Sequence, residues 1–157
     1  MKQVQVQVLS KEAFAPYGIV LETGECMTKD PSGACDWGGN LCVMEGIESS
    51  AFNLMTVYPR EATFRKFECH EKTAEAVIPL GGRGIIIPLA PPGVVTEETV
   101  TAFYVPGNKA VVFHPGTWHY WPFTYEESAT FITTYRAATP EDDVYFAELP
   151  EKMSLTL

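Results

Sequence analysis

Short strand-like runs separated by glycine and proline follow one another along almost the whole chain, and regular helical periodicity is nearly absent. A doubly wound α/β fold would need intervening helices of about 10–15 residues, and no stretch has that pattern. Turn signals such as Gly81-Gly82 and Pro106-Gly107 separate the runs. The pattern predicts an all-β chain that forms a closed barrel or a two-sheet jelly roll. The expected strands cover residues 41–46, 52–58, 64–70, 76–80, 83–89, 101–105, 110–113 and 129–135.

The remaining segments are less regular. Valine alternates with glutamine over residues 3–8, which predicts a further strand. Ser10 is expected to cap a short helix that runs through Phe14. Residues 24–40 hold four glycines and a proline, so they are predicted to form a loop. The segment after Pro140 is acidic and mixed, and its pattern is compatible with a short helix or an extended arm.

The size of the chain favours one domain. With 157 residues it is expected to fold as a single domain over 1–157. A chain of this size buries roughly 70% of its unfolded surface, so it needs no disulfide or metal merely to fold. The four cysteines, at positions 26, 35, 42 and 69, form no C-x2-C pair. Zinc-ribbon and thioredoxin readings are therefore disfavoured, and reduced thiols are expected.

Charge limits the expected partners. The formal net charge of −9 repels phosphate backbones and anionic lipid surfaces, so no nucleic-acid or membrane partner is expected. A small anionic substrate would need a local cation, either an arginine or a bound metal. The N-terminal residues lack the apolar core of a signal peptide, and prolines interrupt the most apolar stretch, at 85–95. These features predict a cytoplasmic protein.

The chain has only three histidines, His70, His114 and His119, and the segments that contain them are the candidates for catalysis or metal binding. Glu68 and His70 are two residues apart on an expected strand, so their side chains point to the same face and into the barrel. An E-x-H triplet by itself occurs by chance in many proteins. Glu75, five residues after His70, and His119, which follows two turns further on, make the set more specific.

The first of two cupin motifs, G-x5-H-x-H-x3-4-E-x6-G, resembles the segment that begins at Glu68. His70, Glu75 and Gly82 match the motif, and Glu68 stands in place of its first histidine. The second motif, P-x-G-x2-H, is matched by Gly116-x2-His119, with His114 where the proline is usual. The resemblance implies a divalent metal inside the barrel, held by Glu68, His70, Glu75 and His119.

The chemistry of these four residues agrees with that implication. Two imidazoles and two carboxylates that converge on one point suit Mn, Fe, Co, Ni or Zn. Two carboxylates facing an apolar interior without a cation would repel each other and lose their hydration. The alternative is a purely structural barrel in which Arg65, Lys66 and Arg83 neutralise the carboxylates.

The resemblance extends to one branch of the cupins, the ureidoglycolate lyase family. The segments ECHEKTAEAVIPLGG, HPGTWHYWPF and FITTYR are similar to its E-x-H-x4-Q-x-F-I-P, H-x3-W-H-x-P and F-x-T-x-D-R blocks. LSKEAFAPYGIVLE is similar to its opening block, and the matches keep their order from about residue 9 to residue 136. The chain departs from the family pattern at Ile19 (Asp), Glu75 (Gln), Tyr120 (His) and Tyr135 (Asp).

The family resemblance implies a cupin-type β-barrel, often a homodimer, that splits ureidoglycolate into glyoxylate and urea. It also implies a divalent metal, for which nickel, manganese, zinc and iron are the candidates. In the resulting hypothesis the metal binds the carboxylate and hydroxyl of the substrate, and His114 and Glu75 are the candidate proton carriers. Arg136 matches the family arginine and either pairs with the substrate carboxylate or forms an ion pair at the rim.

Two other functions stay open at this level. The substitutions at 75, 120 and 135 are compatible with a metal-dependent cupin enzyme that acts on another small hydroxy acid or sugar acid. The second open function is that of a cupin that binds a small ligand without converting it. Substrate panels separate the first from a ureidoglycolate lyase, and ligand-induced thermal stabilisation without turnover marks the second.

Overall fold

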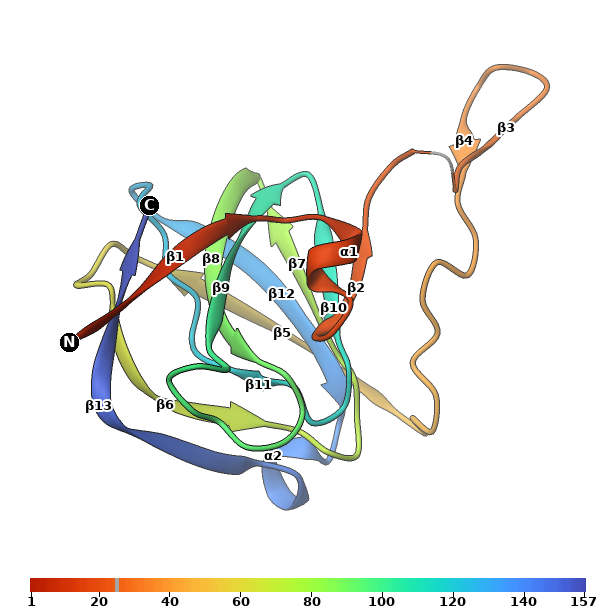
Figure 1. Cartoon of the computed structure of the whole chain (residues 1–157). Helices are drawn as coiled ribbons and strands as arrows, with labels where there is room; N and C mark the ends of the chain where they lie inside the picture. The colour runs from red at the N-terminus through yellow and green to blue at the C-terminus, as the bar shows by residue number, and fades with distance from the viewer. Residues whose placement is uncertain (25) are drawn as a thin grey trace.

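Two β-sheets make up the body of the protein in a computed structural model, which describes residues 1–24 and 26–157. Six strands close into a barrel (Figure 1). In barrel order they are β1 (Lys2–Val8), β13 (Tyr145–Thr156), β6 (Thr63–Cys69), β11 (Trp118–His119), β8 (Gly82–Ala90) and β9 (Thr101–Gly107). The second sheet has the order β2 (Gly18–Leu21), β10 (Ala110–Phe113), β7 (Glu75–Leu80), β12 (Ala129–Arg136) and β5 (Ser50–Val57). The prediction of an all-β, cupin-type barrel is confirmed.

The strands of the barrel separate two apolar cores. Along β8, Ile85, Ile87 and Leu89 belong to a core shared with β2, β7, β10 and β12, which therefore lies between the two sheets. Ile86 and Ala90, on the other face of β8, belong to a second core made only by barrel strands and their loops. This alternation is what a strand with both faces buried requires. The space between the sheets is where the candidate site lies.

The expected N-terminal strand and helix are confirmed. β1 pairs in parallel with β13 and with β9. The helix α1 (Lys11–Phe14) begins after Ser10, whose Oγ accepts a hydrogen bond from the Ala13 backbone N–H at 3.1 Å. Phe14 is fully buried in the core between the sheets.

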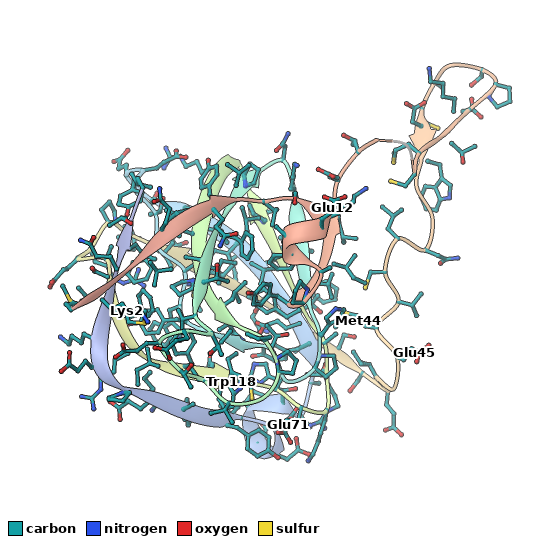
Figure 2. All side chains as sticks on the ribbon, in the orientation of Figure 1. Lys2, Glu12, Met44, Glu45, Glu71 and Trp118 are labelled. Carbon is teal, nitrogen blue, oxygen red and sulfur yellow. The ribbon has the colours of Figure 1, made fainter. Side chains whose placement is uncertain are left out.

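The strand expected at residues 41–46 is wrong, because this segment forms no strand. It belongs to an extended stretch that leaves the body and carries a two-stranded hairpin of β3 (Thr28–Lys29) and β4 (Asp36–Trp37) (Figure 1). Met44 and Glu45 lie on this stretch, away from the side chains packed in the body (Figure 2). With no neighbouring strand to pair with, an apolar run alone does not make a strand. The expected loop at 24–40 holds only these two short strands, and Glu25 lies outside the described residues.

The C-terminal segment contains both of the elements left open by its sequence. One helical turn, α2 (Thr139–Asp142), is followed by the twelve-residue strand β13. β13 pairs with β6, and its register shifts between Glu148 and Met153, around Pro150. The proline and this irregularity explain why the sequence shows no clean alternation there. In the described part of the chain, no helix is both long and apolar enough to cross a membrane.

Candidate metal centre

The ends of β6, β7 and β11 bring four chemistry-bearing side chains together. His119, the last residue of β11, pairs directly with Glu68 of β6, so the two side chains share one face. His70 follows the end of β6, and Glu75 is the first residue of β7. The backbone N–H of Gly116, in the turn before β11, donates a hydrogen bond to the His70 carbonyl at 2.6 Å. This bond connects the turn that leads to His119 with the residue that follows β6.

His70, Glu75 and His119 form the tightest group. One donor atom from each lies within 4.8 Å of the others, and all three side chains are buried. Glu75 Oε2 is 3.5 Å from His70 Nε2 and 3.2 Å from His119 Nε2. Glu68 lies beside this group, with Oε1 3.6 Å from His119 Nε2. The structure therefore brings together the four predicted ligands as a cluster of three and a neighbour.

Backbone carbonyls fix the orientation of both imidazoles. His70 Nδ1 is 2.8 Å from the Asp143 carbonyl oxygen, and His119 Nδ1 is 3.1 Å from that of Thr117. A carbonyl oxygen only accepts hydrogen bonds, so these partners assign the ring proton to Nδ1. In the neutral imidazoles the lone pair is then on Nε2, the atom directed at Glu75. Ring orientation through the second nitrogen is the usual arrangement of metal-binding histidines.

The cluster fits a divalent ion. Glu75 Oε2 is buried and has no hydrogen-bond partner among the described residues, which would be costly for a carboxylate oxygen with nothing bound to it. Neighbouring ligands on an ion with bonds of about 2.1 Å lie about 3.0–3.5 Å apart in tetrahedral or octahedral geometry. The separations of 3.2 and 3.5 Å between Glu75 and the two histidines are of that size.

Electrostatics also favour positive charge at this point. Burial by itself lowers the pKa of His70 and His119, but the carboxylates of Glu75 and Glu68 outweigh it and raise both pKa values above the ordinary one. Burial raises the pKa of Glu68, yet the two histidines and Lys66 outweigh it and hold the pKa below its usual value. Two carboxylates thus lie beside two imidazoles and favour the protonated, cationic form of both rings. A divalent cation bound at this point would supply the positive charge instead.

Three spaces border the cluster: two openings and a small, largely apolar space of about 40 Å³ lined by Glu68, Glu75 and His119. A cavity of about 240 Å³ lies beside His70 and Glu75, and its wall includes the polar side chains of Asn53, Thr133 and Tyr135. The Tyr135 ring lies 5.6 Å from the His70 ring, and burial raises the pKa of its phenol. On the other side, Glu68 and His119 face an open groove of about 210 Å³ with Lys66, Tyr120, Trp121 and Phe146. Of the described residues 24 and 26–40, none lines either opening.

Two of the predicted catalytic residues lie away from the cluster. His114 is exposed, and its Nε2 is 3.2 Å from the Ala15 carbonyl oxygen. The Arg136 guanidinium pairs with Asp142. Neither residue lines the two openings. Their catalytic roles stay predictions without support from the geometry.

None of the three proposed neutralising cations forms an ion pair with Glu68 or Glu75 in the described part of the chain. Arg65 binds the Leu149 carbonyl and Glu148, and Arg83 binds Ser128 and Glu126. The Lys66 ammonium lies 3.8 Å from the centre of the Phe146 ring. Within residues 1–24 and 26–157 no Arg or Lys forms an ion pair with Glu68 or Glu75. The purely structural barrel is therefore not supported.

Sequence reasoning missed three features of the site. Asp143 is buried and contacts His70 although 73 residues separate them, and no motif announces it. Asn53 on β5 and Thr133 on β12 line the cavity beside His70 and Glu75, and neither belongs to a recognisable sequence motif. The alternation of side chains along each strand, which directs these two residues inward, is the signal that could have indicated them.

The closed barrel, the second sheet packed against it and the His/Glu/His cluster between them define a protein of the cupin class. The ureidoglycolate lyase family model matches residues 1–156, and the chain belongs to that family. The match includes residues 24–64, where the sequence shows no recognisable family motif.

Curated relatives agree with this assignment. The chain is 31% identical to the ureidoglycolate lyase of Pseudomonas savastanoi pv. phaseolicola over 94% of this chain and 92% of that one. It is also 31% identical to that of Pseudomonas entomophila, over 100% and 98% of the two chains. Among solved structures, an oxalate decarboxylase from Bacillus subtilis at pH 4.6 matches 67% of this chain with a TM-score of 0.42 and 15% identity, and this chain spans 23% of its length.

Proposed function

We propose that this protein is a metal-dependent ureidoglycolate lyase that cleaves ureidoglycolate into glyoxylate and urea. Family membership over residues 1–156 and relatives of that name support the reaction. The observation that carries the metal dependence is the buried cluster of His70, Glu75 and His119, whose Nε2 and carboxylate atoms face one point. The candidate ions are nickel, manganese, zinc and iron, and the proposed location is the cytoplasm.

In the proposed reaction the side chains bind the ion, hold the substrate and move one proton. His70, Glu75 and His119 would hold the ion, with Glu68 available to complete its coordination. When bound, the ion supplies Lewis-acid polarisation of the substrate carboxylate and hydroxyl oxygens. The cavity wall of Asn53, Thr133 and Tyr135 offers hydrogen bonds to the polar ureido group.

Proton transfer needs a group that faces the substrate. In the cleavage, the substrate hydroxyl loses its proton and becomes the C=O of the aldehyde as the C–N bond breaks. The urea nitrogen then receives a proton, so the net transfer is one proton from oxygen to nitrogen. Glu68 borders both openings, so its carboxylate can face the substrate and accept that proton. We therefore assign the proton transfer to Glu68 when it does not coordinate the ion, because His114 lies outside the site.

The test is glyoxylate release from racemic ureidoglycolate by chelated protein, before and after each candidate ion is added back. The proposal expects release that depends on the ion and stops near half conversion, because an asymmetric site selects one enantiomer. Folded protein that releases no glyoxylate with any ion would contradict it. A panel of small hydroxy acids and sugar acids, together with thermal-shift measurements, would then distinguish another enzyme from a ligand-binding cupin.

Lys66 is the cation best placed to attract the substrate carboxylate. It lines the groove beside Glu68 and His119, whereas Arg136 is held by Asp142. An exposed charge-assisted contact contributes on the order of 1 kcal/mol, so Lys66→Gln is expected to raise KM about fivefold and leave kcat nearly unchanged. Steady-state kinetics would show this, with the exposed Lys152→Gln as the matched control. An unchanged KM would exclude Lys66 from substrate binding.

The proposal includes a homodimer, as the family resemblance implies. Phe52 and Leu54 are 73% and 69% exposed on β5, the edge strand of the second sheet. Exposed apolar side chains in a row on a sheet are typical of an interaction surface, and a second copy of the chain is the proposed occupant. Light scattering is expected to give the mass of two chains, and a monomer at working concentrations would contradict this part of the proposal.

A further inference from the structure

Asp143 lies between α2 and β13 and is almost completely buried, with 1% of its surface exposed. Three of its atoms bind the segment that begins at His70. The carbonyl oxygen accepts from His70 Nδ1 at 2.8 Å, and Oδ1 and Oδ2 accept from the backbone N–H groups of Glu71 and Lys72, both at 2.9 Å. One residue therefore binds both the imidazole and the backbone that follows it.

The bound segment sets the geometry of the cluster. Residues 71–74 carry the chain from β6 in the barrel to β7 in the second sheet, so their conformation determines the separation of His70 from Glu75. The other end of this connection is also fixed, because Thr73 Oγ1 accepts a hydrogen bond from the Arg136 backbone N–H at 3.1 Å. Asp143 itself is anchored through its own N–H, which donates to the Thr139 carbonyl at 3.0 Å.

We infer that Asp143 is a positioning residue for the metal centre, which holds the His70 ring with Nε2 free and fixes the connection from His70 to Glu75. The inference rests on the proposed metal site. A buried carboxylate is tolerated only when its oxygens are satisfied, and here both are bound by backbone N–H groups of that connection. The neighbouring Asp142 is exposed and pairs with Lys72 and Arg136, so it does not share this role.

Asp143→Asn tests the inference. The asparagine side chain keeps one acceptor oxygen and turns an NH₂ donor toward a backbone N–H, so one hydrogen bond is lost and the connection loosens. Groups that orient metal ligands typically change metal affinity by about 10- to 100-fold, and the variant is expected to bind Zn²⁺ at least tenfold more weakly. Isothermal titration of the chelated full-length protein measures this, with the exposed Glu141→Gln on α2 as the matched control.

A second readout distinguishes positioning from simple stabilisation. A purely structural role would lower the unfolding temperature of the chelated variant and leave its Zn²⁺ affinity and its His70 ring tautomer unchanged, and that result would overturn the inference. The expected ¹⁵N spectrum shows His70 protonated on Nδ1 in the native protein. In Asp143→Asn it shows mixed tautomers, because the loosened connection weakens the hydrogen bond between the ring and the backbone carbonyl of residue 143.

If the variant does not fold, the ¹⁵N spectrum of the native protein still tests the inference. A native His70 protonated on Nε2 would overturn it. Zinc binding is measured without turnover. A native protein that binds Zn²⁺ but does not cleave ureidoglycolate would therefore contradict the proposed function and leave this inference intact.

Discussion

Replacing His70 by alanine is expected to remove metal binding and to reduce glyoxylate release to the background rate, while the fold is retained. The imidazole supplies one of two nitrogen donors, and its Nε2 is 3.5 Å from Glu75 Oε2, the atom shared with His119. The loss of one nitrogen ligand from the three-residue cluster is expected to weaken the binding of a divalent ion strongly. Metal analysis after desalting, together with the ureidoglycolate assay, measures both effects.

The matched control for this substitution is Glu71→Ala. Glu71 is the next residue, and its side chain is exposed at the edge of the body (Figure 2). Circular dichroism should show the same β spectrum for both variants, because His70 lies at the end of β6 and outside both apolar cores. A His70→Ala protein that retains its metal and its full rate would show that the cluster is not the active site.

Glu75→Gln is expected to weaken metal binding at least tenfold and to lower turnover in proportion to the metal lost. The substitution preserves the shape of the side chain but removes the negative charge of the oxygen that lies nearest both imidazoles. Affinity for a divalent ion depends on the number of charged ligands, so a neutral amide oxygen is the weaker donor. The expected turnover recovers when the ion is supplied in excess.

Glu71→Gln is the matched control, because it removes an exposed carboxylate four residues away. Titration with Mn²⁺ and Zn²⁺ gives the affinities of both variants. If Glu75→Gln binds the ion as tightly as the native protein, Glu75 is not a ligand. If it binds the ion weakly but stays inactive when saturated, Glu75 also acts on the substrate.

Strand parity explains which site residues the sequence could predict. Glu68 lies near the end of β6, His70 follows that end two residues on, and His119 pairs with Glu68 across the β6–β11 pair, so the cupin-like spacing predicted that these side chains would meet. The same parity explains why the structure places His114 and Arg136 away from the cluster. Phe113 stacks on His119, so His114, the next residue, is directed away from the cluster.

Arg136 follows the same rule on β12. Tyr135 faces the His70 ring, and the residue after it therefore points to the other side of the strand. There α2 brings Asp142 within reach of its guanidinium. Sequence similarity to a family arginine gave no information on that pairing, because it depends on the turn between β12 and α2.

Contacts between distant segments that no motif marks could not be predicted. Asp143 meets His70 only because α2 and β13 return along β6, and β13 itself is interrupted by Pro150 and a shift in register. The error at residues 41–46 has a related cause, because whether an apolar run forms a strand depends on a partner strand that one segment does not reveal.

In the proposed mechanism, the cleavage of ureidoglycolate depends on an ion bound by His70, Glu75 and His119. The most direct measurement is the initial rate of glyoxylate release from chelated protein as the active ion is titrated in, with bound metal counted in the same samples. A rate that rises linearly from background and levels off at a single ion per chain is the predicted result. Full activity in the chelated protein, or bound ion without any change in rate, would contradict the claim.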